Sequence, residues 1–210
     1  MTRAARIAFW ALCAFLAVGV ALYGLRYVFL GPSIAPPNIA SNATPVPHAL
    51  ILHAAGAGIA LLVGPWQFIA GLRAKAPRVH RWIGRTYACA CIFGGLAGLA
   101  LAPFSSAGPI AQSGFTLLAL AWLATTSLGW RAALARDFAA HQDWMLRSFA
   151  LAFAAVTLRL YTPIPYFTGL DPDEAYRWIA WLCWIPNLVL VELWLRARRA
   201  ARIGAASAAP

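Results

Sequence analysis

Two histidines stand at matching places in the sequence and are of a residue type that holds haem or a metal ion. His80 precedes the segment 82–87 and His141 precedes the segment 144–149; each segment reads Trp-x-x-Arg, then a hydroxyl residue, then an aromatic one. A pair of neutral imidazoles from two helices at one depth is what a b-type haem requires. His80 and His141 are therefore the candidate axial ligands of a haem b electron carrier.

The same two histidines are also the candidate ligands of a metal-dependent membrane enzyme, with Asp137 or Asp143 in support. A metal that activates water needs about three protein ligands and an open position. The sequence contains no HExxH motif, which would place two ligands on one helix face. Whether the protein is an enzyme stays open at this stage.

A second group of polar residues is expected deeper in the protein and predicts a binding pocket. His53 and Arg159 interrupt apolar segments, and ionisable groups inside such segments are costly unless they face a cavity or a partner. Together with Gln67 and Tyr87 they would line an interior pocket for a small molecule, a lipid or a quinone. Two further aromatic residues are assigned to its wall, Trp66 and Tyr161.

Basic residues beside the inner histidines have a simpler interpretation. Arg81 and Arg147 are expected to contact anionic lipid head groups or another anion. Asp143 lies four residues before Arg147, a spacing that predicts a local ion pair on a helix. Glu192 is expected to pair with Arg196 in the same way.

The composition determines what kind of fold must position these residues. The chain has 210 residues, of which 62% are hydrophobic and only 11% are charged. So little polar surface cannot cover a soluble globule, so the excess apolar surface must face the lipid bilayer. The formal net charge is +11, but the cations gather at the ends of apolar segments, which argues against nucleic acid as a partner.

Apolar runs long enough to cross a bilayer recur six times, which predicts an all-α polytopic membrane bundle. The first span occupies residues 1–30, and the membrane core occupies residues 48–195 with a basic tail at 196–210. The remaining spans are expected at 48–72, 81–102, 114–134, 144–161 and 175–195.

The distribution of lysine and arginine predicts the orientation of this bundle. These residues are frequent at the N-terminus, between spans two and three, between spans four and five, and at the C-terminus. The positive-inside rule then places both termini in the cytoplasm. We expect a multi-pass protein of a bacterial inner membrane; the sequence gives no oligomeric state.

Periodicity places the histidines on helix faces with small residues. At 100° per residue, His53 shares a stripe with Gly56 and Gly64, and His141 shares one with Ser148 and Arg159. Small residues let membrane helices approach closely, so the three histidine-bearing helices are expected to pack on one another. The similar segments after His80 and His141 also predict an internal repeat of two helix hairpins.

These polar residues resemble a family of bacterial membrane proteins grouped as domain of unknown function 2306. The resemblance extends from about His53 to Glu192 and leaves out the first span and the last dozen residues. It rests on six pieces: His53, Gly64-Pro65-Trp66-Gln67-Phe68, His80-Arg81-Trp82-x-Gly84-x-x-Tyr87, His141-x-x-Trp144-Met145-x-Arg147-Ser148, Leu158-Arg159 and Trp181-x-x-Trp184-x-x-Asn187-x-x-x-x-Glu192. The resemblance implies a membrane protein but carries no activity. The prediction is therefore a bundle that binds a small molecule, lipid or quinone or supports a larger membrane complex.

Overall fold

The computed structural model describes residues 2–35, 39 and 43–207, and these residues form helices and turns without a strand. Six helical segments are long and apolar enough to cross a membrane, which confirms the predicted six-span, all-α architecture. They are Arg3–Leu30, Pro47–Phe68, Pro77–Phe104, Pro109–Leu134, Phe138–Thr168 and Pro172–Gly204. The predicted ranges overlap all six of them.

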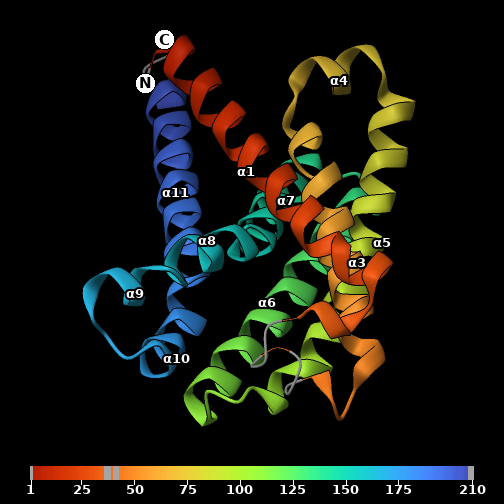
Figure 1. The fold of residues 1–210 in the computed structure, drawn as a ribbon. Helices are drawn as coiled ribbons and strands as arrows, with labels where there is room; N and C mark the ends of the chain where they lie inside the picture. Colours follow the sequence, from red (N-terminus) through yellow and green to blue (C-terminus); the bar gives the residue numbers. More distant parts are fainter. Residues whose placement is uncertain (1, 36–38, 40–42, 208–210) are drawn as a thin grey trace.

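Several spans consist of more than one helix (Figure 1). The α-helices are α1 Arg3–Leu30, α3 Pro47–Val63, α4 Ala70–Lys75, α5 Pro77–Leu101, α6 Pro109–Leu134, α7 Phe138–Ala152, α8 Ala154–Tyr161, α9 Ile164–Thr168, α10 Pro172–Leu182 and α11 Ile185–Ser207. Short 3-10 helices lie at Pro32–Ile34, Pro65–Phe68 and Ala102–Phe104.

Prolines and aspartates set where most of these helices begin. Pro47, Pro77 and Pro109 each stand in the first turn of a helix. Backbone N–H groups in the first turn have no acceptor within the helix, so proline loses no hydrogen bond there. Asp137 and Asp171 cap α7 and α10 by accepting bonds from Ala140 N at 3.0 Å and Glu174 N at 2.7 Å. His80 therefore lies inside the first turn of α5, one residue before the predicted start of that span.

The fifth and sixth spans are interrupted, which the sequence did not predict. Phe153 separates α7 from α8, and Cys183 with Trp184 separates α10 from α11 just before Pro186. Proline cannot donate its hydrogen bond within a helix, which explains the second break. The face that begins at His141 is therefore not continued by one straight helix to Arg159.

The tightest helix contact joins α3 to α5 through glycines. A Cβ added at Gly56 would lie 2.6 Å from both Ala90 O and Gly94 Cα, and one at Gly94 would lie 2.9 Å from Ala57 N. Only glycine permits the two backbones to approach so closely. The predicted packing of these two histidine-bearing helices is thereby observed.

The third histidine-bearing helix, α7, also contacts α3 and α5, but less extensively than it contacts α6. The main partner of α7 is α6, which also packs against α5. Gly129 of α6 makes room for Met145 of α7, since a Cβ there would lie 2.6 Å from Met145 Sδ. The buried core where these helices meet includes Leu61, Tyr87, Trp122 and Phe149.

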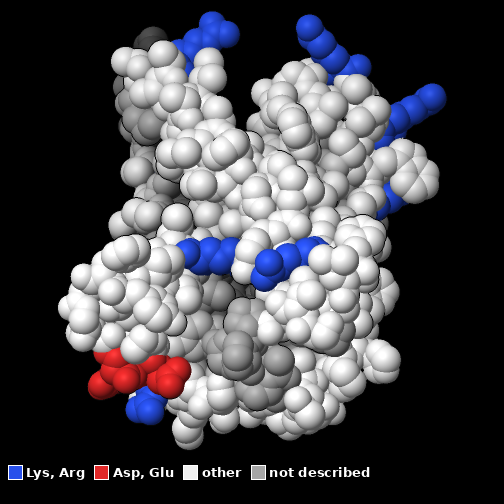
Figure 2. Space-filling view, in the orientation of Figure 1, with Lys and Arg blue, Asp and Glu red and all other residues white. Residues whose placement is uncertain are grey.

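The two ends of the bundle differ in charge. The start of α1, the end of α11 and the turn around α4 lie at the same end (Figure 1). Figure 2 shows basic side chains at this end and an acidic group at the opposite end, over α10. We call the basic end inner and the other end outer, following the positive-inside prediction. The cytoplasmic location of the termini and the internal repeat remain predictions.

Candidate functional site

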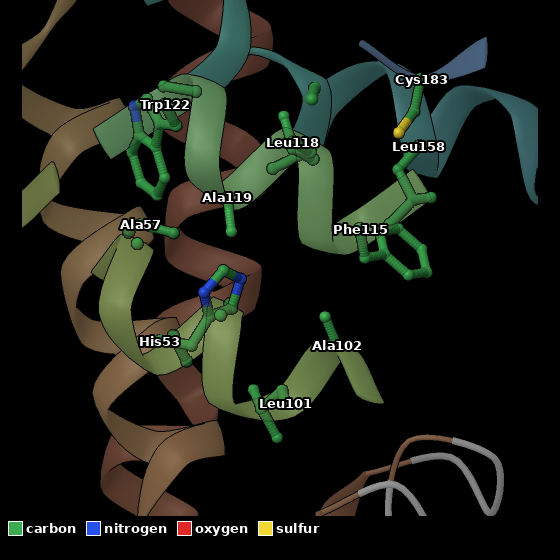
Figure 3. A pocket seen from close by; sticks show the side chains of 18 of the residues that line it. His53, Ala57, Leu101, Ala102, Phe115, Leu118, Ala119, Trp122, Leu158 and Cys183 are labelled. Atoms are coloured by element: carbon green, nitrogen blue, oxygen red, sulfur yellow. The ribbon is translucent and has the colours of Figure 1, made fainter. Parts of the chain in front are cut away.

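A cavity of about 250 Å³ lies in the outer half of the bundle, among α1, α3, α5, α6, α8, α10 and the end of α7. Most of its wall is apolar and includes Leu61, Phe115, Leu118 and the ring of Trp122. Figure 3 shows the His53 side chain reaching into this space. Its lining also includes Arg159, so the structure brings together two residues that lie 106 positions apart. We call this space the outer cavity.

The hydrogen bonding of His53 fixes its tautomer. Its Nδ1 lies 2.9 Å from Gly94 O of α5. A carbonyl oxygen only accepts, so Nδ1 carries the proton and donates it. In the neutral ring, Nε2 is then left as an acceptor for a donor from another molecule. The glycine contact makes this bond possible, because a Cβ at Gly98 would lie 2.9 Å from the same Nδ1.

Arg159 supplies a positive charge that no acidic side chain of the described residues neutralises. Its Nη1 donates to Ala155 O at 2.9 Å within its own helix. Its Nε is shielded from solvent and has no hydrogen-bond partner, and none of the ion pairs found among the described residues includes Arg159. A desolvated guanidinium without a carboxylate is costly in a membrane protein. The guanidinium is therefore available to an acceptor that enters the cavity.

Ser105 provides a further free polar group at the cavity. The residue is 5% exposed, and its hydroxyl has no hydrogen-bond partner in the described part of the chain. Its backbone oxygen, in contrast, accepts a bond from Gln112 Nε2 at 3.2 Å. A buried hydroxyl normally finds a partner. The outer cavity thus combines an apolar wall with a donor at Arg159, an acceptor at His53 and a free hydroxyl at Ser105.

The other residues assigned to the pocket from sequence lie elsewhere. Tyr87 is 2% exposed and its hydroxyl lies 3.0 Å from Ser148 Oγ, which in turn lies 2.7 Å from Thr126 Oγ1. This buried chain ties α5, α6 and α7 together. Trp66 is 49% exposed and donates to Leu62 O, and neither it nor Tyr161 lines the cavity.

Gln67 lies beside His80 at the inner end, not beside His53. With its amide oriented to satisfy both atoms, Gln67 Nε2 donates to His80 Nδ1 at 2.8 Å and Oε1 accepts from Gly84 N at 3.3 Å. His80 Nδ1 is then an acceptor, so the neutral ring carries its proton on Nε2. The 3-10 turn at Pro65–Phe68 places Gln67 against the start of α5.

His141 has the opposite arrangement. Its Nδ1 lies 2.8 Å from Gly129 O of α6, so Nδ1 donates and Nε2 is left as the acceptor. His80 and His141 lie close enough to interact electrostatically. The two inner histidines therefore have different tautomers, and no hydrogen bond joins them among the described residues.

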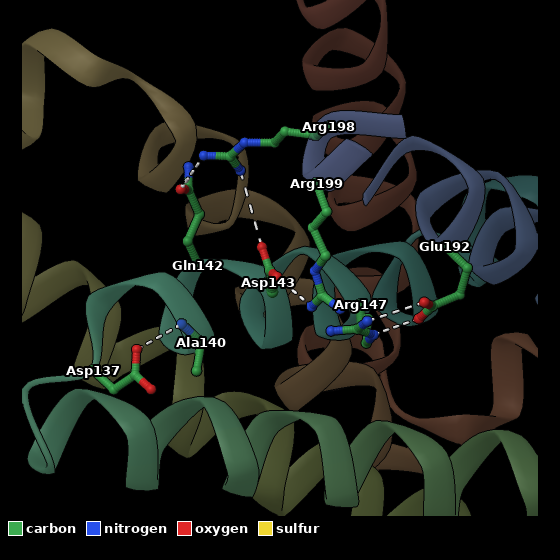
Figure 4. Close-up of polar contacts among 8 residues, drawn as sticks. All are labelled: Asp137, Ala140, Gln142, Asp143, Arg147, Glu192, Arg198 and Arg199. Carbon is green, nitrogen blue, oxygen red and sulfur yellow. Dashed lines mark hydrogen bonds and ion pairs between the residues drawn. The ribbon is translucent and has the colours of Figure 1, made fainter. Parts of the chain in front are cut away.

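The charged residues around His141 are paired across helices (Figure 4). Arg147 donates from both Nε and Nη2 to the carboxylate of Glu192, with the second bond at 3.0 Å. Asp143 Oδ2 accepts from Arg199 at 2.7 Å, and its other oxygen lies 4.0 Å from Arg198. The local pairs expected for Asp143 with Arg147 and for Glu192 with Arg196 are therefore wrong, because α11 lies against α7 and offers closer partners.

A family comparison decides where this chain belongs. The family model described as "Predicted membrane protein (DUF2306)" matches residues 50–195, which is more than half of the chain. The chain belongs to the DUF2306 family. No curated protein and no solved structure matches it. The DUF2306 match confirms the predicted resemblance and a membrane protein, but it assigns no activity.

The haem and metal alternatives find little support in this DUF2306 protein. A haem ligand coordinates through a nitrogen that carries no proton, and a protein partner usually accepts from the other ring nitrogen. His141 meets this requirement, but His80 accepts from Gln67 and keeps its proton on Nε2. The described residues contain no group of three His, Cys, Asp or Glu side chains placed to hold a metal. Asp137 is occupied as the cap of α7.

Two of the predicted anion contacts differ from each other. Arg81 is exposed at the start of α5, where contact with lipid head groups remains a prediction. Arg147 is only 12% exposed, and Glu192 and the ring of Trp144, 4.6 Å away, already occupy its guanidinium. Arg147 is therefore a structural residue and not a free anion contact.

Sequence reasoning missed residues of α1 that lie outside the DUF2306 match. Tyr27 is 4% exposed and lines the outer cavity, and Arg26 bonds to it. Arg26 interrupts an apolar run of 24 residues at positions 7–30, and this single charge was the signal that could have identified it. Ser105 and Tyr176, which also line the cavity, carry no comparable signal because such residues are common near helix ends.

Proposed function

We propose that this protein binds a small, largely apolar molecule of the lipid or quinone type in the outer cavity, in the cytoplasmic membrane of a bacterium. The polar end of the ligand carries oxygen atoms. The single observation that supports this most is that three residues lining an otherwise apolar space carry shielded polar atoms without a hydrogen-bond partner in the described part of the chain: Arg159 Nε, Ser105 Oγ and Trp122 Nε1.

The chemistry of the wall favours an oxygen-bearing head. Arg159 donates only, and His53 Nε2 accepts when the ring is neutral. A carbonyl or carboxylate oxygen satisfies the arginine, whereas a hydroxyl also satisfies the histidine. A hydroxyquinone ring or a glycerol head offers both kinds of group, and its remaining carbon atoms match the apolar wall.

The size of the cavity limits which part of such a molecule it holds. Its volume of about 250 Å³ is just below the range of about 300–1,000 Å³ usual for drug-sized ligands. The cavity therefore accommodates a ring or a head group with the first part of a chain. A longer tail would extend between the helices into the lipid.

Thermal stabilisation tests this proposal, using decylubiquinone and monoolein as probes. A ligand that binds only the folded protein stabilises it by about 2.7 kcal/mol at a concentration one hundred times its Kd. We expect at least one probe to raise the melting temperature of the detergent-solubilised protein. Ala119→Leu should abolish the rise, because the Ala119 side chain faces the cavity (Figure 3).

Ala124→Leu is the matched control, since Ala124 is exposed on the same helix and does not line the cavity. This variant should respond to the probe as the parent protein does. An equal rise in Ala119→Leu and in the parent protein would show that the probe binds elsewhere. The absence of a rise with both probes would contradict the proposal for both ligand types.

A further inference from the structure

Two arginines from distant segments meet over one tyrosine ring beside the outer cavity. The guanidinium carbon of Arg26 lies 3.8 Å from the centre of the Tyr23 ring, and that of Arg159 lies 5.5 Å from the same centre. The two guanidinium carbons are thus no farther apart than the sum of these distances. Basic side chains are visible across the middle of the face in Figure 2, at the height of α8 and of the outer half of α1.

Neither arginine has an acidic partner in the part of the chain that the structure describes. The ion pairs found among the described residues include neither Arg26 nor Arg159. The Nε atoms of both are shielded from solvent and lack a hydrogen-bond partner within residues 2–35, 39 and 43–207. Two cations at this separation repel each other, and the partial removal of Arg159 from water strengthens the repulsion. The arrangement becomes favourable once an anion lies between or beside them.

The tyrosines hold Arg26 in place and connect it to the outer cavity. Arg26 Nη2 donates to Tyr23 Oη at 2.7 Å and to Tyr27 Oη at 3.2 Å. Tyr27 is 4% exposed and lines the cavity, as does Arg159. The arginine pair and the cavity therefore form one continuous site with a charged end and an apolar end.

We propose that Arg26 and Arg159 together bind an anionic head group, a phosphate or carboxylate, of an amphiphile whose apolar part enters the outer cavity. This inference rests on the proposed function and narrows its ligand to an anion. Guanidinium groups bind the oxygens of phosphate and carboxylate through paired, charge-assisted hydrogen bonds. The Nε donors have no hydrogen-bond partner among the described residues, so a small rotation of either guanidinium toward the anion would let Nε contribute such a bond.

Binding of two matched probes tests the inference. Oleoyl lysophosphatidic acid carries a phosphate head, and monoolein carries the same acyl chain with a neutral glycerol head. We expect the detergent-solubilised protein to bind the phosphate probe at least tenfold more tightly, as measured by native mass spectrometry. Arg26→Gln should remove this preference, and a melting temperature close to that of the parent protein would show that the variant is folded. Arg26→Lys should retain part of the preference.

Arg177→Gln is the charge-matched control, because Arg177 is exposed on α10 and does not line the cavity. It should bind both probes as the parent protein does. Equal binding of the two probes by the parent protein would overturn the inference and leave the proposed function intact. Equal preference for the phosphate probe in Arg26→Gln and in the parent would also overturn it. Failure of both probes to bind would overturn the inference and count against lipid ligands in general.

Inorganic phosphate at millimolar concentration distinguishes two sources of the same anion. Displacement of lysophosphatidic acid by phosphate, lost in Arg26→Gln, would support a site that also binds the free anion. If phosphate does not displace lysophosphatidic acid, and the parent protein still binds this probe more tightly than Arg26→Gln does, the site binds the anion only as the head of an amphiphile.

Discussion

The outer cavity and the inner end of the bundle contain the same kinds of residue but satisfy them differently. At the inner end, Arg147 is bound by Glu192, and His80 is bound by Gln67. At the outer cavity, Arg159 has a shielded Nε and no acidic partner in the described part of the chain. Buried polar groups that the protein leaves unpaired are costly, and a bound ligand can repay this cost. The comparison therefore favours the outer cavity as the binding site.

The two regions also show that a histidine in a membrane span does not by itself indicate a ligand. His53 and His141 both donate from Nδ1 to a glycine carbonyl on the neighbouring helix, at 2.9 and 2.8 Å. Only His53 lines the outer cavity. The two histidines therefore differ in what surrounds the second ring nitrogen, Nε2, and this difference distinguishes a candidate ligand contact from a structural histidine.

The largest loss of stability is expected from adding a side chain at Gly56, where α3 and α5 contact each other near His53. Gly56→Ala places a Cβ 2.6 Å from Ala90 O and Gly94 Cα, and both of these atoms belong to backbone that cannot move aside cheaply. We expect a loss of about 3 kcal/mol of stability, together with loss of ligand binding. Gly19→Ala is the control, since a Cβ there meets nothing within 4 Å. Melting temperatures in detergent measure both; equal values would show that α3 and α5 do not touch through Gly56.

A smaller loss should follow removal of the acid at the inner end. Glu192→Gln leaves Arg147, 12% exposed, without its counter-charge, whereas Glu192 itself is 33% exposed. A fully buried broken pair costs about 3–5 kcal/mol, so we expect about 2 kcal/mol here. Binding to the outer cavity should be unchanged. Denaturant titration measures the loss. Unchanged stability in Glu192→Gln would mean that water or lipid forms the hydrogen bonds of Arg147 in place of Glu192.

Much of the architecture was readable from the sequence because the bilayer permits few solutions. Length and hydropathy alone located six spans, since unpaired backbone is not tolerated in lipid. The breaks at Phe153 and at Cys183–Trp184 were not predicted. Pro186 gives a local reason for the second break, whereas Phe153 offers no such signal, because its neighbours are ordinary helix formers.

Only part of the candidate site could be predicted from the sequence. His53 and Arg159 stood out because charge inside a span is rare, and the structure places both at one cavity. Gln67 shares a helix face with His53, and Tyr87 shares one with Gly94, the partner of His53. Both lie at a different depth from His53, because Gln67 lies against His80 and Tyr87 lies against Ser148. Periodicity gives the face of one helix but not which partner meets it. The pairing of Arg147 with Glu192 joins residues 45 positions apart and was invisible for the same reason.

At the outer cavity, removal of a charged side chain should raise the stability of the protein instead of lowering it. Arg159→Met keeps a long side chain against the ring of Tyr23 and removes a desolvated charge that has no acidic partner among the described residues. We expect the ligand-free protein to become more stable by up to about 1 kcal/mol, at the expense of ligand binding. Melting of delipidated protein measures this. A clear loss of stability would indicate that Arg159 has a structural role like that of Arg147.

The smallest effect is expected at the rim of the inner end. Arg199 is 61% exposed and pairs with Asp143 at 2.7 Å, while Arg198 lies 4.0 Å from the same carboxylate. Exposed ion pairs contribute little because water and salt screen them, with a screening length of about 8 Å at physiological ionic strength. Arg199→Gln should therefore lower the melting temperature several-fold less than Glu192→Gln does, and the difference from the parent should vanish in high salt. A salt-resistant loss as large as that of Glu192→Gln would mean that the contact of α11 with α7 depends on the whole charge network, and that the inner end responds as one unit rather than pair by pair.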